Sequence, residues 1–190
     1  MNTYSIVLYI HLLALLLAIT AATLVTYASL QLRAATTPPD VGRWGGLIER
    51  VVPAFPIAAL TLFGSGAYMT QDAWTWSTPW IDAAIAGLAM LVIIGEGIHA
   101  SRGRALKKEV MANGMSERAK GLLRDPIAWS ANMTTLTLVL AVVFVMTAKP
   151  GAGGSSATLI VAFFAGIAAA VPFWRTAPQT ETPAVTEPAA

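Results

Sequence analysis

The chain has 190 residues, of which 56% are hydrophobic and only 12% are charged, and its net charge is +2. Soluble domains carry about 25% charged residues, so this chain has too little polar surface to form a soluble fold. It has no cysteine, which excludes disulfides, thiolate metal sites and cysteine nucleophiles. The composition therefore predicts an all-α bundle that crosses a membrane several times.

Five apolar stretches are long enough to cross the hydrocarbon core, which takes about 20 residues of helix. The first contains no charged residue up to position 31, and it lacks the basic start of a cleaved signal peptide. The predicted helices form a single bundle over residues 1–175 and cover about 4–31, 51–71, 80–101, 127–148 and 157–174. The short linker at 149–156 predicts a tight hairpin between the last two helices.

Lysine and arginine predict the orientation of these helices. Eleven of the twelve basic residues lie in segments 32–50 and 102–126 or follow the fifth helix as Arg175, and only Lys149 lies in the opposite loops. Basic residues accumulate in cytoplasmic loops, so the N-terminus is predicted outside and the C-terminus inside. The tail at 176–190 is rich in Pro, Thr and Ala and is predicted to be a disordered cytoplasmic segment.

Segment 102–126 carries seven of these basic residues. Its pattern is typical of an amphipathic helix that breaks near Asn113 and Gly114. Such a segment is expected to lie on the anionic headgroups of the lipid bilayer, and a specific acidic partner is the alternative. The sequence contains no phosphate-binding loop and no aromatic platform for nucleic acid, so no nucleic-acid partner is predicted.

Ionisable side chains within membrane spans are candidates for function by default. The clear examples here are His11, Glu96 and His99. His11 lies on a stripe with Ala14, Ala18 and Ala22, and small residues at this spacing mark helix contacts, so His11 is expected to point into the bundle. It is interpreted either as hydrogen-bonded to a neighbouring hydroxyl or carbonyl, or as an axial ligand or proton-transfer group.

Depth argues against a haem that is bound by both histidines of one chain. His11 lies toward the outer side and His99 toward the inner side, about 20 Å apart along the membrane normal at 1.5 Å per residue. A single iron does not bridge that distance, because each metal–nitrogen bond is about 2 Å long. Two arrangements remain: His11 with a methionine at similar depth, Met69 or Met146, or two His11 residues across a homodimer.

The stretch "IIGEGIHASRGRALKK" at 93–108 places a glutamate three residues before a histidine. On an α-helix Glu96 and His99 share a face, which Arg102 continues. We interpret these residues as a polar inner vestibule in which Glu96 is protonated or is paired with His99, Arg102 or Arg50. A metal site of this kind requires further carboxylates from other helices, and a proton or cation pathway is the third interpretation.

Two stretches, "YSIVLYIHLLALLLAITAA" (4–22) and "LTLFGSGAYMTQDAWTWSTPWIDAAIAG" (60–87), resemble a family of uncharacterised bacterial integral-membrane proteins. That family is similar to the copper-resistance protein D type. The shared features are Ile10-His11, Gly64 with Gly66, and Trp80. The resemblance implies a small helical bundle in the bacterial cytoplasmic (inner) membrane that handles haem b or copper, with His11 as the candidate ligand.

Three hypotheses for function follow, and no catalytic motif assigns an enzyme activity. The leading hypothesis is a small integral membrane protein that binds haem or a metal ion near the outer leaflet through His11. The second is a non-enzymatic accessory subunit of a larger membrane complex. The third is a proton- or cation-coupled carrier that uses Glu96.

Overall fold

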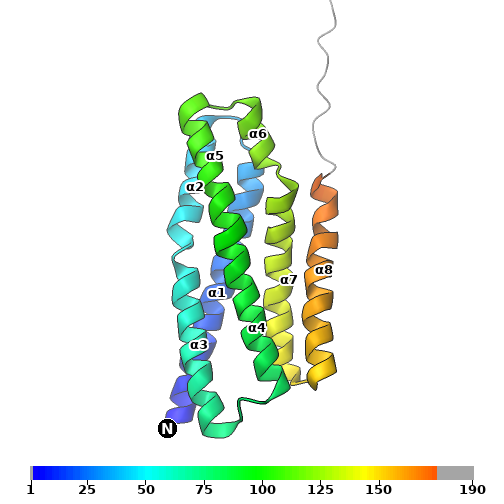
Figure 1. Ribbon diagram of the computed structural model, residues 1–190. Coiled ribbons are helices and arrows are strands. Elements are labelled where there is room, and N and C mark those ends of the chain that lie inside the picture. The colour runs from blue at the N-terminus through cyan, green and yellow to red at the C-terminus, as the bar shows by residue number, and fades with distance from the viewer. Residues whose placement is uncertain (1, 175–190) are drawn as a thin grey trace, which may run out of the picture.

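The computed structural model describes residues 2–174, and the predicted tail at 176–190 lies outside the described residues. The described residues form an all-helical bundle (Figure 1). Within them, five helical stretches are long and apolar enough to cross a membrane, which confirms the predicted number of spans. These stretches are Thr3–Arg33, Pro38–Ala73, Pro79–Asn113, Glu117–Ala148 and Ala152–Trp174. The chain is therefore a multi-pass membrane protein.

The helices extend beyond the spans predicted from hydropathy. In chain order they are α1 (Thr3–Arg33), α2 (Pro38–Val51), α3 (Ala54–Ala73), α4 (Pro79–Ile94), the π-helix η1 (Gly95–His99), α5 (Ala100–Asn113), α6 (Glu117–Leu123), α7 (Pro126–Ala148) and α8 (Ala152–Trp174). Much of the predicted loop at 32–50 is thus helix α2. Thr37 caps this helix and Pro38 pre-sets the backbone of its first turn, which favours helix over loop.

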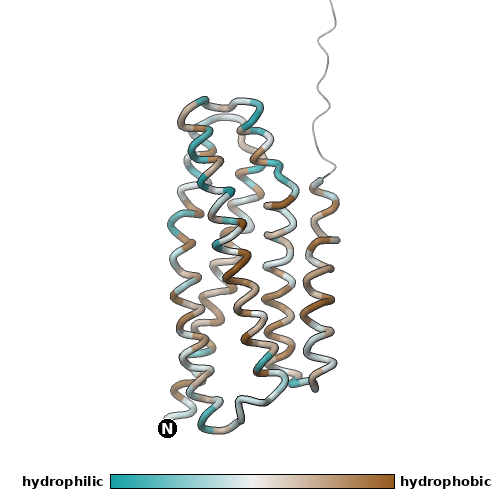
Figure 2. Tube along the Cα trace, in the orientation of Figure 1, coloured by the Kyte–Doolittle hydropathy of each residue, from teal (hydrophilic) through white to brown (hydrophobic). Residues whose placement is uncertain are grey.

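The two ends of the bundle differ in composition. Hydrophilic residues collect at the end formed by α2, α5 and α6, which we call the basic end (Figure 2). The opposite end holds the N-terminus and the α3–α4 loop (Figure 1). We call it the tryptophan end because Trp74 and Trp76 lie in this loop and Trp80 begins α4. Apolar residues predominate between the two ends, as expected for a bundle in a bilayer.

The helices pack as two units. In the first unit α1 packs along α3 and against α2, and in the second α7 packs along α8 and against α4. Small residues form the contact in the first unit: Ala14 and Ala22 of the predicted stripe are buried. Larger side chains, among them the fully buried Leu138 and Val145, fill the core of the second. The helices α4, η1 and α5 follow one another without a break, and we call them the rod. The difference between the units matters for the site, because His11 belongs to the first unit whereas Glu96 lies on the rod.

The α7–α8 hairpin is tighter than its linker predicted, because α8 already begins at Ala152. Lys149 ends α7 in the left-handed conformation, with φ of 49°. Along the hairpin, Gly166 lies directly against the backbone of Thr134, and a Cβ at this position would overlap the Thr134 Cα. Glycine here allows the two backbones to approach closely, as in many membrane helix pairs.

The two units are joined at the basic end. Val41 of α2, Leu106 of α5 and Leu123 of α6 form a small buried cluster, and Lys107 donates to the Glu49 carboxylate at 2.8 Å. The rod of α4, η1 and α5 continues out of the apolar layer. The burial of Leu106 against Val41 and Leu123 stabilises the part of α5 beyond that layer. The chain then turns at Gly114, with φ of 62°, which is the predicted position of the break.

A lysine and two indole rings hold the tryptophan end together. The Lys149 ammonium lies 4.3 Å from the centre of the Trp74 ring and 5.3 Å from that of Trp80. The two rings meet edge to face, with their centres 5.0 Å apart. This contact connects the end of α3 to the start of α4 and to the α7–α8 turn.

Lys149→Gln is expected to destabilise the protein by about 1 kcal/mol, because cation–π contacts at exposed sites contribute about 0.5–1 kcal/mol each. For a chain of this length, that is a fall of roughly 2–4 °C in Tm, measurable by thermal unfolding in detergent. Lys120→Gln is the control, because Lys120 forms an ion pair with Glu117 on the surface of α6 and has no cation–π contact among residues 2–174. Equal shifts for the two variants would contradict a stabilising role for the Lys149 contact.

Candidate functional site

His11 lies half-buried between α1 and α3. Its Nδ1 is 2.9 Å from the Ser65 hydroxyl oxygen, and the Ser65 hydroxyl donates its own proton to the Thr61 carbonyl. With the Ser65 proton on the Thr61 carbonyl, the Ser65 oxygen accepts from the imidazole, and in this tautomer Nδ1 carries the proton and Nε2 keeps its lone pair. This geometry combines the two interpretations of His11, because the hydrogen bond leaves one ring nitrogen able to ligate.

Gly66 makes room for the imidazole ring. A Cβ at Gly66 would lie 3.6 Å from the His11 Cε1, so the ring packs directly over the backbone of α3. In the sequence, Gly64 and Gly66 were named only as features of the resemblance, and Ser65 was not identified as the partner of His11. The signal was present in "GSG", where the hydroxyl stands between two residues without side chains.

The structure separates the two methionines proposed as partners of His11. Met69 is buried and lies one turn after Ser65 on the same side of α3. Met146 packs against the core of the second unit, formed by α4, α7 and α8. Of the two, Met69 is the one on the helix that contacts His11.

The donor set at His11 limits the group that could bind there. Residues 2–174 contain no cluster of three or more His, Cys, Asp or Glu that could hold a metal ion. His11 and Met69 offer one imidazole and one thioether, a pair that suits an axial haem site or a soft copper ion. Structural zinc sites use four protein ligands, which this pair does not supply.

The stretch that contains Glu96 and His99 is the π-helix η1. Such turns are rare and occur as bulges within α-helices, frequently at functional sites. Their i→i+5 hydrogen bonds wind more residues into each turn, so side chains three residues apart no longer lie above one another. Glu96 is exposed whereas His99 is partly buried, and neither makes a side-chain hydrogen bond or ion pair with residues 2–174.

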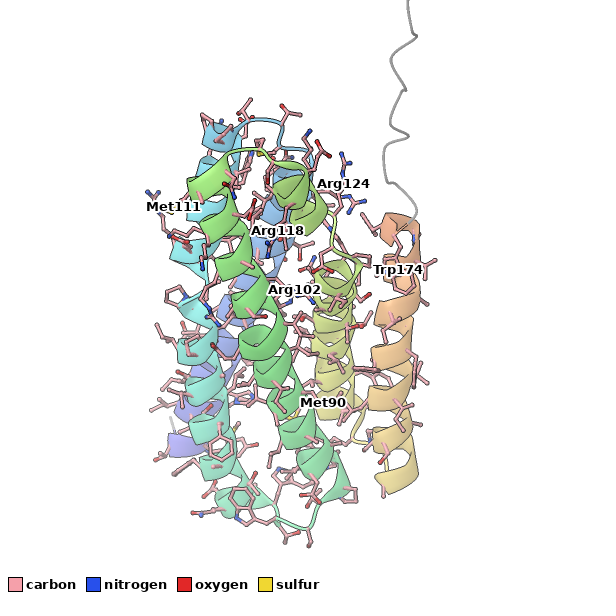
Figure 3. The ribbon with its side chains drawn as sticks, turned by 45° about the horizontal axis from the view of Figure 1, so that its top comes forward. Met90, Arg102, Met111, Arg118, Arg124 and Trp174 are labelled. Carbon is pink, nitrogen blue, oxygen red and sulfur yellow. The ribbon has the colours of Figure 1, made fainter. Side chains whose placement is uncertain are left out.

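Arg102 bonds to Asp125 and not to Glu96. Asp125 is 8% exposed, and its carboxylate also accepts from the Ile127 backbone at 2.9 Å, which caps α7. Figure 3 shows Arg102 on the rod at the level where α7 begins. The Asp-Pro pair was a sequence signal for this cap, since Pro126 occupies the first turn of α7. Glu96 thus contacts none of its three predicted partners.

Polar side chains of α7 fall into two groups. Thr137 donates to the Ala162 carbonyl of α8 at 2.7 Å, and Thr134 packs against Gly166, so both belong to the α7–α8 contact. Asn132 Nδ2 and Thr135 Oγ1 are buried without a partner among residues 2–174. Buried polar atoms of this kind are usually satisfied by water, and α7 packs against η1. The vestibule of Glu96, His99 and Arg102 stays a prediction.

Arg33 connects the two units at the basic end. Its Nη2 donates to the Phe173 carbonyl at 2.7 Å, and its guanidinium lies 5.3 Å from the Trp129 ring. The Trp129 and Phe173 rings are stacked, with centres 4.6 Å apart. The end of α1 is thereby tied to α7 and α8, a contact that the sequence did not reveal because Arg33 is one of many basic residues near the ends of the spans.

Glu96→Gln is expected to leave stability nearly unchanged, because Glu96 has no charged partner within residues 2–174. Asp125→Ala is the contrasting variant and should destabilise by about 2 kcal/mol or more, because it removes a charge-assisted hydrogen bond and a helix cap. Thermal unfolding of both variants in detergent tests this difference. A loss for Glu96→Gln as large as for Asp125→Ala would mean that Glu96 anchors a buried ion pair.

No family model, curated protein or solved structure matches the chain. The resemblance to the copper-resistance protein D type therefore stays a prediction. The function of the protein is therefore argued from its described side chains. Two sites have the clearest chemistry: His11 with Ser65 and Met69, and Glu96 of η1.

Proposed function

We propose that the protein is a non-enzymatic subunit of a larger membrane complex in the bacterial cytoplasmic membrane. The observation that carries this proposal is Glu96, an exposed carboxyl without a partner in residues 2–174, on a rod that crosses the membrane. Ionisable groups in spans are costly unless they pair or face water. A neighbouring subunit on this face would supply the missing partner.

Counted along the helix from Trp80, Glu96 falls inside a hydrocarbon core of ordinary thickness. It precedes Arg102 by six residues, or about 9 Å along the helix. It follows Trp80 by sixteen residues, or about 24 Å. A hydrocarbon core of about 30 Å that begins near Trp80 therefore contains Glu96. A carrier would use the same carboxyl, but Glu96 forms no hydrogen bond or ion pair with a second titratable side chain within residues 2–174.

The exposure of the first unit also supports a role in assembly. Only 6% of the most apolar window of Pro38–Ala73 is buried, compared with 33% for Glu117–Ala148. α3 therefore contributes little to the core of this chain and offers most of its surface to lipid or to another subunit. Membrane helices associate through packing and polar contacts, and α3 makes such contacts within the chain mainly with α1.

The proposed orientation places the basic end in the cytoplasm, with the N-terminus outside and the C-terminus inside. The asymmetry of lysine and arginine supports it. A reporter fused after Arg175 is expected to be active in the cytoplasm, and one inserted after Thr75 in the α3–α4 loop should be active outside. The reverse pattern would place the basic end outside and the tryptophan end in the cytoplasm, and would contradict the proposed orientation.

The test of the proposed function is the mass of the assembly. The chain is extracted from native membranes at its natural abundance in a mild detergent, and its mass is measured by light scattering after size exclusion. We expect a stoichiometric complex with at least one other membrane protein. A monomer of 19.9 kDa, in detergent and in nanodiscs alike, would overturn the proposal, and an integer multiple of that mass would replace it with a homo-oligomer.

A second candidate function is the binding of haem b or copper at His11. The observation that favours it is the Nδ1–Ser65 hydrogen bond, because a metal-bound histidine almost always donates from its other ring nitrogen. His11 would hold the haem or copper through Nε2, together with Met69 or a second His11 across a homodimer. Bound haem would add redox or ligand-binding chemistry to the subunit.

A further inference from the structure

We infer that the Glu96 face of α4 and η1 binds a transmembrane helix of a different protein, and that this helix carries a lysine or arginine at the depth of Glu96. The inference rests on the proposed function and deepens it, because it names the chemistry of the partner. We define the Glu96 face as Ile85, Ala89, Val92, Ile93 and Glu96.

The Glu96 face is the side of the rod that the chain leaves uncovered. Ile85, Ala89, Val92 and Ile93 recur at α-helical spacing, and Glu96 follows them in η1. All five residues are exposed, with Ile93 at 69%. The opposite side of α4, including Gly87 and Ile94, is buried against the second unit. One side of α4 therefore packs into the core of the chain, and the other side is exposed and can contact a neighbour.

Charge complementarity identifies the neighbour. Lipid chains can cover Ile85, Val92 and Ile93, but they offer no donor or charge to Glu96. A lysine or arginine would form a charge-assisted hydrogen bond with the carboxylate, and in a low-dielectric layer that attraction is far stronger than in water. The small Ala89, one helical turn before Ile93, allows the partner backbone to approach the rod.

A second copy of this chain does not fit the same face. Two copies in one membrane orientation place Glu96 at the same depth as Glu96, which brings like charges together. Two basic side chains that border the apolar layer among residues 2–174 are already engaged within the chain. Arg102 bonds to Asp125, and Arg33 bonds to the Phe173 carbonyl. A span of a different protein that carries a basic residue fits this face without bringing one Glu96 beside another.

The test is site-specific photo-crosslinking of the full chain in its native membrane. The photo-reactive amino acid p-benzoyl-phenylalanine is placed at Ile93, next to Glu96, and in a matched control at Leu140 of α7, which is 68% exposed. We expect Ile93 to crosslink to one membrane protein, within a span that contains a lysine or arginine. Leu140 is expected to crosslink only to lipid.

Charge exchange then tests the ion pair. Glu96→Lys should lower the yield of the Ile93 crosslink at least about tenfold, because truncating or reversing one member of a desolvated charge pair weakens binding by at least that factor. Replacing the partner's basic residue with glutamate should restore the yield. Glu96→Gln is the milder variant, and the expected loss is smaller because an amide still accepts a hydrogen bond.

Three results would overturn the inference. They are a crosslink to a span without a basic residue, a crosslink to a second copy, and equal yields of the Ile93 crosslink in the chain with Glu96 and in the Glu96→Gln and Glu96→Lys variants. The outcome is separable from that of the proposed function. If the chain elutes in a complex while Ile93 reaches only lipid, the subunit role stands and this face is not the interface. If the chain is also monomeric, both proposals fail.

Discussion

Gly166→Ala is expected to be among the most destabilising single-methyl changes in this protein, with a loss of about 3 kcal/mol. Overpacking typically costs about 1–3 kcal/mol, and the upper value applies because the new Cβ meets backbone. It would overlap the Thr134 Cα and lie 2.7 Å from the Thr134 amide nitrogen. Backbone atoms cannot rotate away as a side chain can, so α7 and α8 must separate.

Separation of these two helices would also weaken the bond from the Thr137 hydroxyl to the Ala162 carbonyl, which is 2.7 Å long. In thermal unfolding in detergent, followed by tryptophan fluorescence, we expect Tm to fall by roughly 6–12 °C, from about 2–4 °C per kcal/mol for a chain of this size. Gly64→Ala is the matched control, because no atom lies within 4 Å of its added methyl group. Similar shifts for both variants would contradict the close α7–α8 contact.

The five spans were predictable because they depend on local composition. Hydropathy is summed over about 20 neighbouring residues, and no tertiary contact is needed to evaluate it. The ends of the helices were less accessible, because they depend on contacts between distant segments. α5 continues beyond the apolar layer, where Leu106 packs against Val41 of α2 and Leu123 of α6. The sequence of α5 alone does not reveal that contact.

The direction of His11 was predictable, whereas its partner was not. The alanines on the same stripe indicate which side of α1 is packed. The pairing of His11 with Ser65 depends on how α1 and α3 align, and these two residues are 54 positions apart in the sequence. The partner of Arg102 was missed for a similar reason: Asp125 lies 23 positions away, across α5 and α6. Sequence spacing within one helix favoured Glu96 instead.

The arrangement of Glu96 and His99 shows a different limit. Their spacing of three residues predicts a shared face only if the helix is α-helical. One extra residue in the turn converts it to the π-helix η1, which changes the relative direction of the two side chains. Gly95 and Gly97 flank Glu96 and leave open space around the turn, but glycine alone does not distinguish a π-turn from an α-turn.

His11→Ala is expected to abolish a Soret band if the second candidate function is correct. The purified wild-type protein, expressed with ample haem, should then show the band, and His99→Ala should leave it largely intact. The reason is depth: the two histidines are separated by about 20 Å along the membrane normal at 1.5 Å per residue, so only one of them can ligate a given iron. Equal losses for both variants would contradict the described helix register.

The methionines provide a matched pair for the same experiment. Met69→Ala should shift the Soret band, because Met69 is buried one turn from the partner of His11, whereas Met146→Ala should not, because Met146 packs in the second unit. Ser65→Ala should weaken binding without abolishing it, since it removes the hydrogen bond that orients the imidazole; such outer partners typically contribute about 10–100-fold in affinity. Metal analysis of the same samples detects copper. A colourless protein without copper would leave His11 as a packing residue that ties α1 to α3 through Ser65, and the assembly function would then rest on Glu96 alone.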